Sequence, residues 1–507
     1  MKNTTRRNML RLIGCVALAG SLWNAAAEAE EPGQGWRPVT TVFHVHSDTS
    51  TGSDSLESLV AKARSYGIEA IILTDNFLLR FEYGLSPLPG LIRRTVALPS
   101  IMSYGVERYL EAIREANQRH PDVLLVPGVE VVPHYYWTGS LFGKDLTMHD
   151  AQKNILVVGL PSETDYKRLP VAGNYAAYEY GWPTVLWLSP VLLVGPAVWL
   201  LNRRVERKVK VGWTFMVVRS RQGGLGVALL IVAGLLLFNN YPFARPAFDI
   251  YQDGNGLQPY QRLIEYVRER GGLTVWSMPE VRDSHRYSFG RLGIVTVKTD
   301  PYPDVLLQTG DYTAFGALYG DTITMTDPGG VWDAVLGEYA SGRRASPVWG
   351  MGEAVFHSRG QAGKELQDVE TILWVRERTE PALLDAMAKG RMYASLRSKE
   401  YGLVLKEFAL LSEATGEPAI SGQTVRAPAL TPVVVRLAVS SDDGNSHQTP
   451  FQVIRSGRLM KTGTESVPFT LTLRDTAPAA GEMSYYRLMI GTGEHRIVSN
   501  PIFIRGE

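Results

Sequence analysis

The stretch TTVFHVH at residues 40–46 decides the fold class. It begins as a β-branched, apolar run, which is typical of a buried strand. It ends on His44 and His46, and Asp48 follows two residues later. Residues two apart on a strand point to the same face, so both imidazoles can reach one ion. The stretch therefore predicts a buried strand with a pair of potential metal ligands at its end.

Strand and helix patterns alternate along the chain around this stretch. Apolar residues recur at helical spacing from Leu56 and stop before Gly67, with Ser53 or Asp54 as the expected N-cap. Further strands are expected at residues 68–74, 123–132, 154–159, 273–277 and 305–308, and further helices at 106–118, 259–270 and 330–339. Alternating units of this kind favour a parallel barrel or an open α/β sheet. We expect this unit in two parts, residues 38–172 and 246–398.

The pattern of apolar and turn residues changes at about residue 400. Short β-rich runs alternate with turn residues, and helical periodicity is absent. These runs lie at residues 432–439, 451–455, 469–473, 485–490 and 501–505. A small C-terminal β-sandwich over residues 400–507 is the expected structure.

Two uncharged apolar stretches, residues 182–201 and 223–243, interrupt the α/β pattern. Each is long enough to cross a hydrocarbon core of about 30 Å as a helix, although a buried core hairpin is the alternative. The connection between them is basic, with Glu206 as its one acid. The positive-inside rule therefore predicts a transmembrane hairpin over residues 182–243 with a cytoplasmic loop. Membrane lipid is the expected partner of this segment.

The first residues have the pattern of a targeting segment. A basic start, an apolar core at residues 12–23 and small residues at 25–29 predict a signal peptide over residues 1–29 that is similar to a twin-arginine signal. An uncleaved anchor and a lipoprotein signal at Cys15 are the alternatives. The expected location is the inner membrane, with the main domains on the periplasmic side. Cys15 is the one cysteine, so metal chemistry must rest on His, Asp and Glu.

Acids and a late histidine follow other apolar runs. Asp75 ends the run at residues 68–74, Glu130 lies in PGVE at 127–130, and His357 ends GMGEAVFH at 350–357. Each of them taken alone is equally compatible with a capping acid or a hydrogen-bonded histidine. Together they form an ordered set of ligands at the ends of successive strands, where α/β sites lie.

This order of motifs resembles the polymerase and histidinol phosphatase (PHP) family of metallophosphoesterases over residues 40–161 and 258–397. The segment EPALLDAMAKGRMYAS at 380–395 is also similar to exported members. The resemblance implies a distorted (β/α)7 PHP-type barrel, here interrupted by the transmembrane helical hairpin and followed by the small β-sandwich. It also implies metal ligation by His44, His46 and the bridging Glu130, with Asp75 as the acid of the second motif.

Several positions depart from the family pattern. Histidine is replaced by Asn76 and Asn154, Met278 stands in a third ligand position, and Val355 replaces the acid two residues before His357. Amide oxygens bind Zn poorly beside imidazole, and a thioether is a poor ligand for such an ion. We therefore expect one divalent ion (Zn, Mn or Fe) rather than three, held by His44, His46, Glu130 and His357. Lower-ranked site candidates are Asp48, Asn76, His149 and Asn154, and His134, Asp145, Asp150 and His285 are further residues that could rebuild a site.

Three functions compete on these observations. The first is a periplasm-facing, metal-dependent phosphoesterase with Glu130 and Asp75 as catalytic residues and a small phosphorylated substrate. The second is a catalytically degenerate PHP-fold module that binds or assembles an envelope protein partner at the membrane, and the third is a structural envelope protein. The net charge of +1 does not favour nucleic acid as a partner. The sequence lacks a phosphate-binding glycine loop and a dinucleotide fingerprint, so no organic cofactor is expected.

Overall fold

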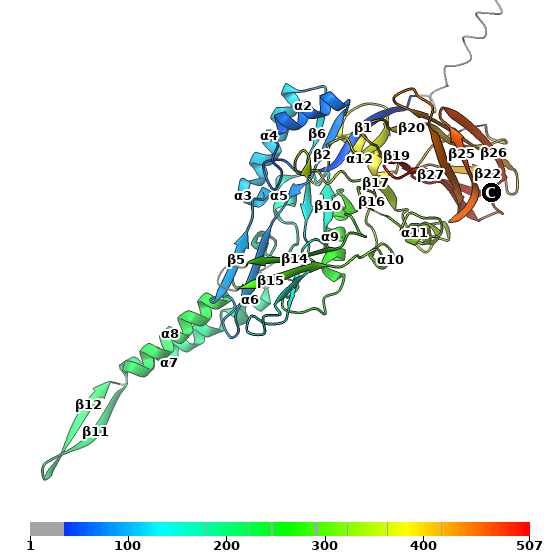
Figure 1. The fold of residues 1–507 in the computed structure, drawn as a ribbon. Helices are drawn as coiled ribbons and strands as arrows, with labels where there is room; N and C mark the ends of the chain where they lie inside the picture. The colour runs from blue at the N-terminus through cyan, green and yellow to red at the C-terminus, as the bar shows by residue number, and fades with distance from the viewer. Residues whose placement is uncertain are drawn as a thin grey trace, which may run out of the picture.

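The computed structural model describes residues 35–507, apart from residues 179, 222, 245, 246, 289–292, 322, 362, 363 and 417. The expected signal peptide at residues 1–29 lies outside the described residues. Figure 1 shows three parts. They are an α/β unit (residues 37–178 and 247–396), a long stalk (residues 182–243) and a β unit (residues 403–506).

The α/β unit is built on a path of paired strands that carries the candidate ligands. Its strands are β1 (Arg37–Val45), β2 (Ala70–Leu73), β3 (Asp75–Asn76), β6 (Leu124–Val126), β7 (Gly128–Val131), β10 (Ile155–Val158), β13 (Leu273–Trp276), β16 (Ala314–Leu318) and β17 (Trp349–Gly352). Strands β1, β2 and β6 pair in parallel. Strand β3 follows β2 in the chain and β7 follows β6, and these two strands begin a second path of paired strands, β3-β7-β10-β13-β16-β17. A parallel bridge from Phe356 to Val45 returns the path to β1. The pairings therefore run round a ring.

Strand β10 departs from the parallel arrangement that the sequence predicts. It is antiparallel to both neighbours, β7 and β13. The connection from β7 to β10 contains no helix but two short strands, β8 (Tyr136–Thr138) and β9 (Thr147–His149). Parallel neighbours need a long crossover, usually a helix, so the missing helix is consistent with the reversed direction.

Helices connect the strands of the α/β unit along the chain. They are α2 (Leu56–Tyr66), α3 (Ile101–Tyr104), α4 (Val106–Arg119), α5 (Glu163–Lys167), η1 (Tyr175–Ala177), α9 (Gln258–Glu269), α10 (Val305–Gln308), α11 (Val331–Ala340) and α12 (Glu380–Ala388). The N-cap of α2 is Ser55, whose hydroxyl accepts a hydrogen bond from the backbone of Ser58, and not Ser53 or Asp54 as expected. Gly67 ends α2 in the left-handed conformation, as predicted.

The strand expected at residues 305–308 is wrong, because this segment forms helix α10. The run of three apolar residues is too short for its period to distinguish a helix from a strand. Val305 and Leu306 are buried, so the run still contributes to the core. The strand of this part of the ring is β16, six residues further on.

Additional strands extend the α/β unit toward the stalk and the β unit. They are β4 (Arg80–Gly84), β5 (Arg93–Ala97), β14 (Asp283–Ser288), β15 (Ile294–Thr299), β18 (Val369–Val375) and β19 (Met392–Leu396). Strands β14, β15, β9 and β8 form a small sheet, and β4 pairs with β5. Figure 1 shows the ends of β5 and β15 close to the root of the stalk.

The stalk differs from the two continuous helices that its sequence predicts. Its elements are α6 (Trp182–Trp187), η2 (Ser189–Leu193), α7 (Val194–Asn202), β11 (Arg204–Val211), β12 (Thr214–Arg221) and α8 (Gly223–Asn240). A 3-10 segment containing Pro190 interrupts the first helix, because proline lacks the backbone donor that an α-helix needs. Among the described residues, α8 is the one helix long and apolar enough to cross a membrane by length and composition. The expected loop is a two-stranded ribbon, which the sequence did not predict.

The β unit has its own apolar core between two sheets. Its strands are β20 (Leu403–Ser412), β21 (Pro418–Ala419), β22 (Thr424–Ala427), β23 (Pro432–Ser441), β24 (Gln448–Arg455), β25 (Arg458–Ser466), β26 (Phe469–Thr476), β27 (Met483–Thr492), β28 (His495–Ser499) and β29 (Ile502–Gly506). Strand β28 pairs with β19, so one sheet continues into the α/β unit. Across the same seam the buried Arg487 and Asp333 form an ion pair, with the Nε of Arg487 at 2.8 Å from Oδ1 of Asp333.

Candidate metal centre

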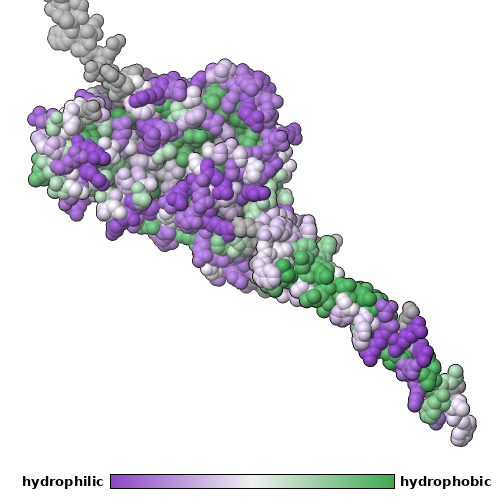
Figure 2. All heavy atoms as spheres, turned by 180° about the vertical axis from the view of Figure 1, so that it is seen from behind, coloured by the Kyte–Doolittle hydropathy of each residue, from purple (hydrophilic) through white to green (hydrophobic). Residues whose placement is uncertain are grey.

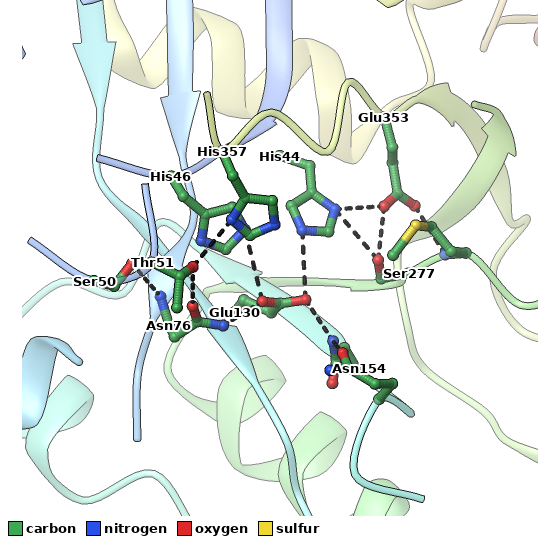
Figure 3. Close-up of polar contacts among 12 residues, drawn as sticks. His44, His46, Ser50, Thr51, Asn76, Glu130, Asn154, Ser277, Glu353 and His357 are labelled. Atoms are coloured by element: carbon green, nitrogen blue, oxygen red, sulfur yellow. Dashed lines mark hydrogen bonds and ion pairs between the residues drawn. The ribbon is translucent and has the colours of Figure 1, made fainter. Parts of the chain in front are cut away.

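Three potential metal ligands from two strands converge at the centre of the α/β unit (Figure 3). Ligand atoms of His44, His46 and Glu130 all lie within 4.8 Å of one another, and all three side chains are buried. Nε2 of His44 lies 3.4 Å from one oxygen of Glu130, and Nε2 of His46 lies 3.6 Å from the other. The three ligands that the sequence singles out from HxH and PGVE are therefore brought together.

The backbone around His44 is adapted to this arrangement. His44 has a φ of 68°, in the left-handed region that residues other than glycine rarely adopt. The pairing of β1 with β2 shifts its register between Phe43 and Val45, on either side of His44. Irregularities of this kind re-aim a side chain at the end of a strand and are common beside functional sites.

The ring nitrogens that face the centre lie at ion-pair distance from Glu130 but are not hydrogen-bonded. Nε2 of His44 and both ring nitrogens of His46 make no hydrogen bond with any residue that the structure describes. A buried polar atom without a partner costs free energy, and most such atoms in proteins are satisfied. Two imidazole nitrogens and a carboxylate are a normal donor set for a divalent transition metal. The residues present therefore fit the metal that the sequence predicts.

Glu353 holds the first of these histidines and was not predicted as a site residue. Its fully buried carboxylate lies 2.7 Å from Nδ1 of His44 and accepts a hydrogen bond of 2.7 Å from the hydroxyl of Ser277. A carboxylate can only accept, so Nδ1 of His44 carries the proton and Nε2 is the atom directed to the centre. Carboxylates in this position orient metal-binding histidines. The available signal was an acid inside the apolar run WGMGEAVF at residues 349–356.

Two asparagines occupy both oxygens of Glu130. The amide nitrogen of Asn154 donates to Oε1, and that of Asn76 donates to Oε2. Asn76 also accepts a 2.7 Å hydrogen bond from the hydroxyl of Thr51. These are the positions at which the family pattern expects histidine. The amides therefore bind the carboxylate instead of serving as ligands.

His357 and Asp75 lie close to the predicted site but outside the group of three. The ring of His357 stacks on that of His46 with centroids 4.0 Å apart, and its Nδ1 is 3.0 Å from the hydroxyl of Thr51. Asp75 accepts hydrogen bonds from the backbone and hydroxyl of Ser47 and from the hydroxyl of Ser50. Asp75 thereby fixes the turn that follows β1, and burial raises its pKa to about 6.

The remaining candidates are dispersed. Asp48 is exposed, and its backbone bonds to Asp54. Nε2 of His149 lies 2.7 Å from the hydroxyl of Thr138 in the small sheet. The further candidates have local partners: His134 contacts Asn255, His285 pairs with Asp283, Asp145 accepts from Ser140, and Asp150 lies near Lys153. None of these residues joins the three converging ligands in the described part of the chain.

Burial and charge set unusual proton affinities at the centre. Burial opposes a charge on His44, but its contacts with Glu130 and Glu353 outweigh this and raise its pKa to about 9. Burial also opposes the charge of Glu130, yet His44 and the other histidines lower the pKa of Glu130 to about 2. Burial lowers the pKa of His46 well below its usual value. Neutral His46 and anionic Glu130 are the forms that bind a cation, and binding at Nε2 of His44 releases a proton.

Comparison with known protein families supports the PHP resemblance for one part of the chain. Residues 43–178 match the profile of the PHP domain family. The matched segment contains His44, His46 and Glu130 and ends before the stalk. No curated protein matches the chain at a significant level.

Three solved structures match the chain at low sequence identity and low TM-score. A two-domain protein from Bacteroides vulgatus, containing a predicted PHP-like metal-dependent phosphoesterase, has 12% identity and a TM-score of 0.36 over 92% of this chain and 94% of its own. An amidohydrolase from Chromobacterium violaceum has 15% identity and a TM-score of 0.26 over 63% and 88%. A protein from Bifidobacterium adolescentis, assigned as a metal-dependent phosphoesterase, has 14% identity and a TM-score of 0.26. The match covers 66% of this chain and 91% of that protein. Likeness at this level carries no information on substrate or activity.

Proposed function

We propose that the α/β unit is a PHP-type phosphoesterase domain that works with a single divalent metal ion. The observation that carries the proposal is the convergence of His44, His46 and Glu130, with Nε2 of both histidines free of hydrogen bonds to the described residues. In this proposal the ring of strands is the family's distorted (β/α)7 barrel, and the β unit is its C-terminal β-sandwich. The substrate class is a small phosphate ester.

The roles of the side chains follow from their contacts. His44 and His46 would hold the ion through Nε2, and Glu130 would hold it through its carboxylate. A bound divalent ion supplies Lewis acidity toward a phosphate oxygen and lowers the pKa of a water molecule toward neutrality. Glu353 keeps the Nδ1 proton on His44, and Asp75 fixes the turn beside the site.

The number of metal ions follows from the asparagines. A carboxylate that bridges two ions directs one oxygen to each of them. Here each oxygen of Glu130 also accepts an amide N–H, from Asn154 or from Asn76. Histidine ligands for further ions are absent at these two positions, so one ion is the expected content.

A second candidate function rests on the same two amides. Two-metal hydrolysis needs ions that stabilise both the attacking and the leaving oxygens, and this arrangement is missing. A single buried ion held by His44, His46 and Glu130 could serve stability alone. The α/β unit would then be a catalytically degenerate module that binds an envelope protein partner.

One experiment separates these functions. The full chain, purified in detergent, is analysed for zinc, manganese and iron and assayed with bis(p-nitrophenyl) phosphate and p-nitrophenyl phosphate. We expect one metal equivalent that disappears in His46→Ala and Glu130→Ala but persists in His149→Ala, and turnover that chelation abolishes. Metal without turnover supports the degenerate module, and a protein with neither stoichiometric metal nor turnover contradicts the phosphoesterase and leaves the degenerate module.

We further propose that the stalk spans the inner membrane, with the α/β and β units on the periplasmic side. Support comes from the apolar α8, of whose residues only 11% are buried, and from the basic residues between α7 and α8. The test is labelling of Lys208→Cys, in a Cys15→Ser background, with a membrane-impermeant maleimide on spheroplasts. Labelling only after lysis supports this orientation, and labelling of intact spheroplasts contradicts it.

A further inference from the structure

The ribbon of β11 and β12 at the end of the stalk is amphipathic. Its strands pair in an unbroken antiparallel register from Arg204 and Arg221 to Val211 and Thr214, with Trp213 in the turn. Side chains alternate between the two faces of such a ribbon, and cross-strand partners share a face. The register therefore assigns the described side chains of the ribbon to two faces.

One face of the ribbon is basic. It carries Arg204, Glu206, Lys208 and Lys210 from β11, and Arg219, Val217 and Phe215 from β12. The acid on this face, Glu206, lies 2.7 Å from the guanidinium of Arg219. Arg204, Lys208 and Lys210 remain as cations in excess over the acid. This face has a net positive charge that favours an anionic surface.

The opposite face is largely apolar. It carries Val205, Arg207 and Val209 from β11, and Val218, Met216 and Thr214 from β12. Val209, Met216 and Val218 are exposed, and Trp213 at the turn is 102% exposed. Exposed apolar groups gathered on one element mark a binding surface rather than an ordinary solvated one.

The position of the ribbon indicates what covers this surface. It continues directly from α7 and α8, whose own apolar side chains are exposed along the stalk (Figure 2). If the stalk spans the bilayer, the ribbon emerges at the leaflet opposite the α/β unit. An element with an apolar face, a basic face and a tryptophan at its turn has the chemistry of a membrane interface with anionic headgroups.

We propose that the β11–β12 ribbon binds anionic phospholipid on the leaflet opposite the α/β unit. In Figure 1 the ribbon continues along the stalk axis, so this contact requires the ribbon to bend at the ends of α7 and α8 until it lies along the leaflet. Its apolar face then enters the acyl boundary, and Lys208 and Lys210 contact the headgroup phosphates. The proposal rests on a membrane-spanning stalk but not on metal binding or catalysis. Attraction to an anionic surface is screened by salt, so the contact depends on both lipid charge and ionic strength.

The experiment measures the polarity around the turn of the ribbon in the full chain. Trp213→Cys in a Cys15→Ser background is labelled with a polarity-sensitive fluorophore and reconstituted into nanodiscs of phosphatidylcholine with increasing phosphatidylglycerol. We expect a blue shift and quenching by spin-labelled lipid that grow with phosphatidylglycerol and disappear in high salt. Lys208→Glu with Lys210→Glu should weaken this partitioning by roughly 25-fold or more, at about fivefold for each lost cation. Lys406→Glu with Lys461→Glu, in the β unit, is the charge-matched control.

The outcomes distinguish lipid binding by the ribbon from membrane insertion of the stalk. Chain that does not enter nanodiscs overturns both the spanning stalk and the proposal. Chain that enters nanodiscs but gives the same emission at every phosphatidylglycerol content overturns the lipid contact alone. A blue shift that appears only when a cytosolic protein fraction is added would assign the ribbon to a protein partner and likewise overturn the proposal.

Discussion

The centre of the α/β unit and the stalk both depart from the usual arrangement of a polar surface around an apolar interior. The centre has polar groups in its interior, and the stalk has apolar groups on its surface. At the centre, His44, Glu130 and Glu353 are buried among apolar strands. On the stalk, apolar side chains such as Phe238, 67% exposed, face outward. A polar interior is stable when each charge has a partner or a metal, and an apolar exterior is stable when something nonpolar covers it. The two departures fit the two proposed ligands, a metal ion at the centre and membrane lipid along the stalk.

The ion pairs at the seam between the two units and on the ribbon differ in burial. The seam between the α/β and β units contains the fully buried Arg487 beside Asp333, while the ribbon contains Arg219 beside the exposed Glu206. In a low-dielectric interior an unpaired charge is very costly, whereas at the surface water replaces the lost partner. Substitutions in the two regions can therefore measure how far burial governs each contact.

The largest effect is expected at the seam. Arg487→Ala leaves Asp333 buried without its cation and removes the side chain that lies 5.1 Å from the ring of Trp332. We expect the free energy of unfolding to fall by about 3–5 kcal/mol. Urea denaturation in detergent, followed by tryptophan fluorescence, measures the change.

A double substitution tests the origin of this loss. Arg487→Met with Asp333→Asn removes both charges and keeps an acceptor for the hydroxyl of Tyr485, so most of the stability should return. If the double variant is as unstable as Arg487→Ala, packing rather than the unpaired charge accounts for the loss.

The second prediction concerns a buried acid outside the metal centre. Burial raises the pKa of Glu370 to about 7, which the nearby Arg397 only partly offsets. Because the unfolded carboxyl ionises near pH 4.5, the unfolded state loses its proton first, and stability falls as the pH rises from about 4.5 to 7. Between pH 4.5 and 7 the free energy of unfolding of Glu370→Gln should therefore decrease by about 2–3 kcal/mol less than that of the unchanged protein. Urea midpoints of both proteins at pH 5 and pH 8 measure it, and parallel pH profiles would contradict the prediction.

Sequence patterns located most strands and the three converging ligands, because both depend on local order. The apolar run before His46 places this residue directly after β1, and the run before Glu130 places that residue within β7. Helix α10 and the β11–β12 ribbon were missed for the opposite reason. A short apolar run and a basic loop have no distinctive period, so tertiary context decides their structure.

The parts of the site that could not be predicted are contacts between distant segments. Glu353 meets His44 across 309 residues, and Asn154 meets Glu130 across 24. No spacing rule connects such pairs. The sequence identified Asn76 and Asn154 as lost ligands, but only the structure shows that their amides donate to Glu130. Likewise, Asp75 was predicted as catalytic from its strand-end position, whereas its contacts are with the turn after β1.

The third prediction tests the polar centre through Glu353. Glu353→Gln keeps the shape but removes the charge that holds the Nδ1 proton of His44. Zinc affinity should fall by about 10–100-fold, the usual effect of losing such a partner. Competition with a chromophoric chelator measures the dissociation constant. Glu265→Gln, on the exposed face of α9, is the control, and equal zinc affinity in both variants would exclude a positioning role for Glu353.

The smallest effect is expected on the ribbon, and it completes the comparison with the seam. Arg219→Ala removes the partner of Glu206, but both side chains are more than half exposed. Water solvates the carboxylate that remains, so the free energy of unfolding should change by less than about 1 kcal/mol. The same urea titration that is used for Arg487→Ala measures it. A loss as large as that at the seam would mean that the pair is desolvated in the detergent-bound protein, because only a desolvated pair can contribute so much.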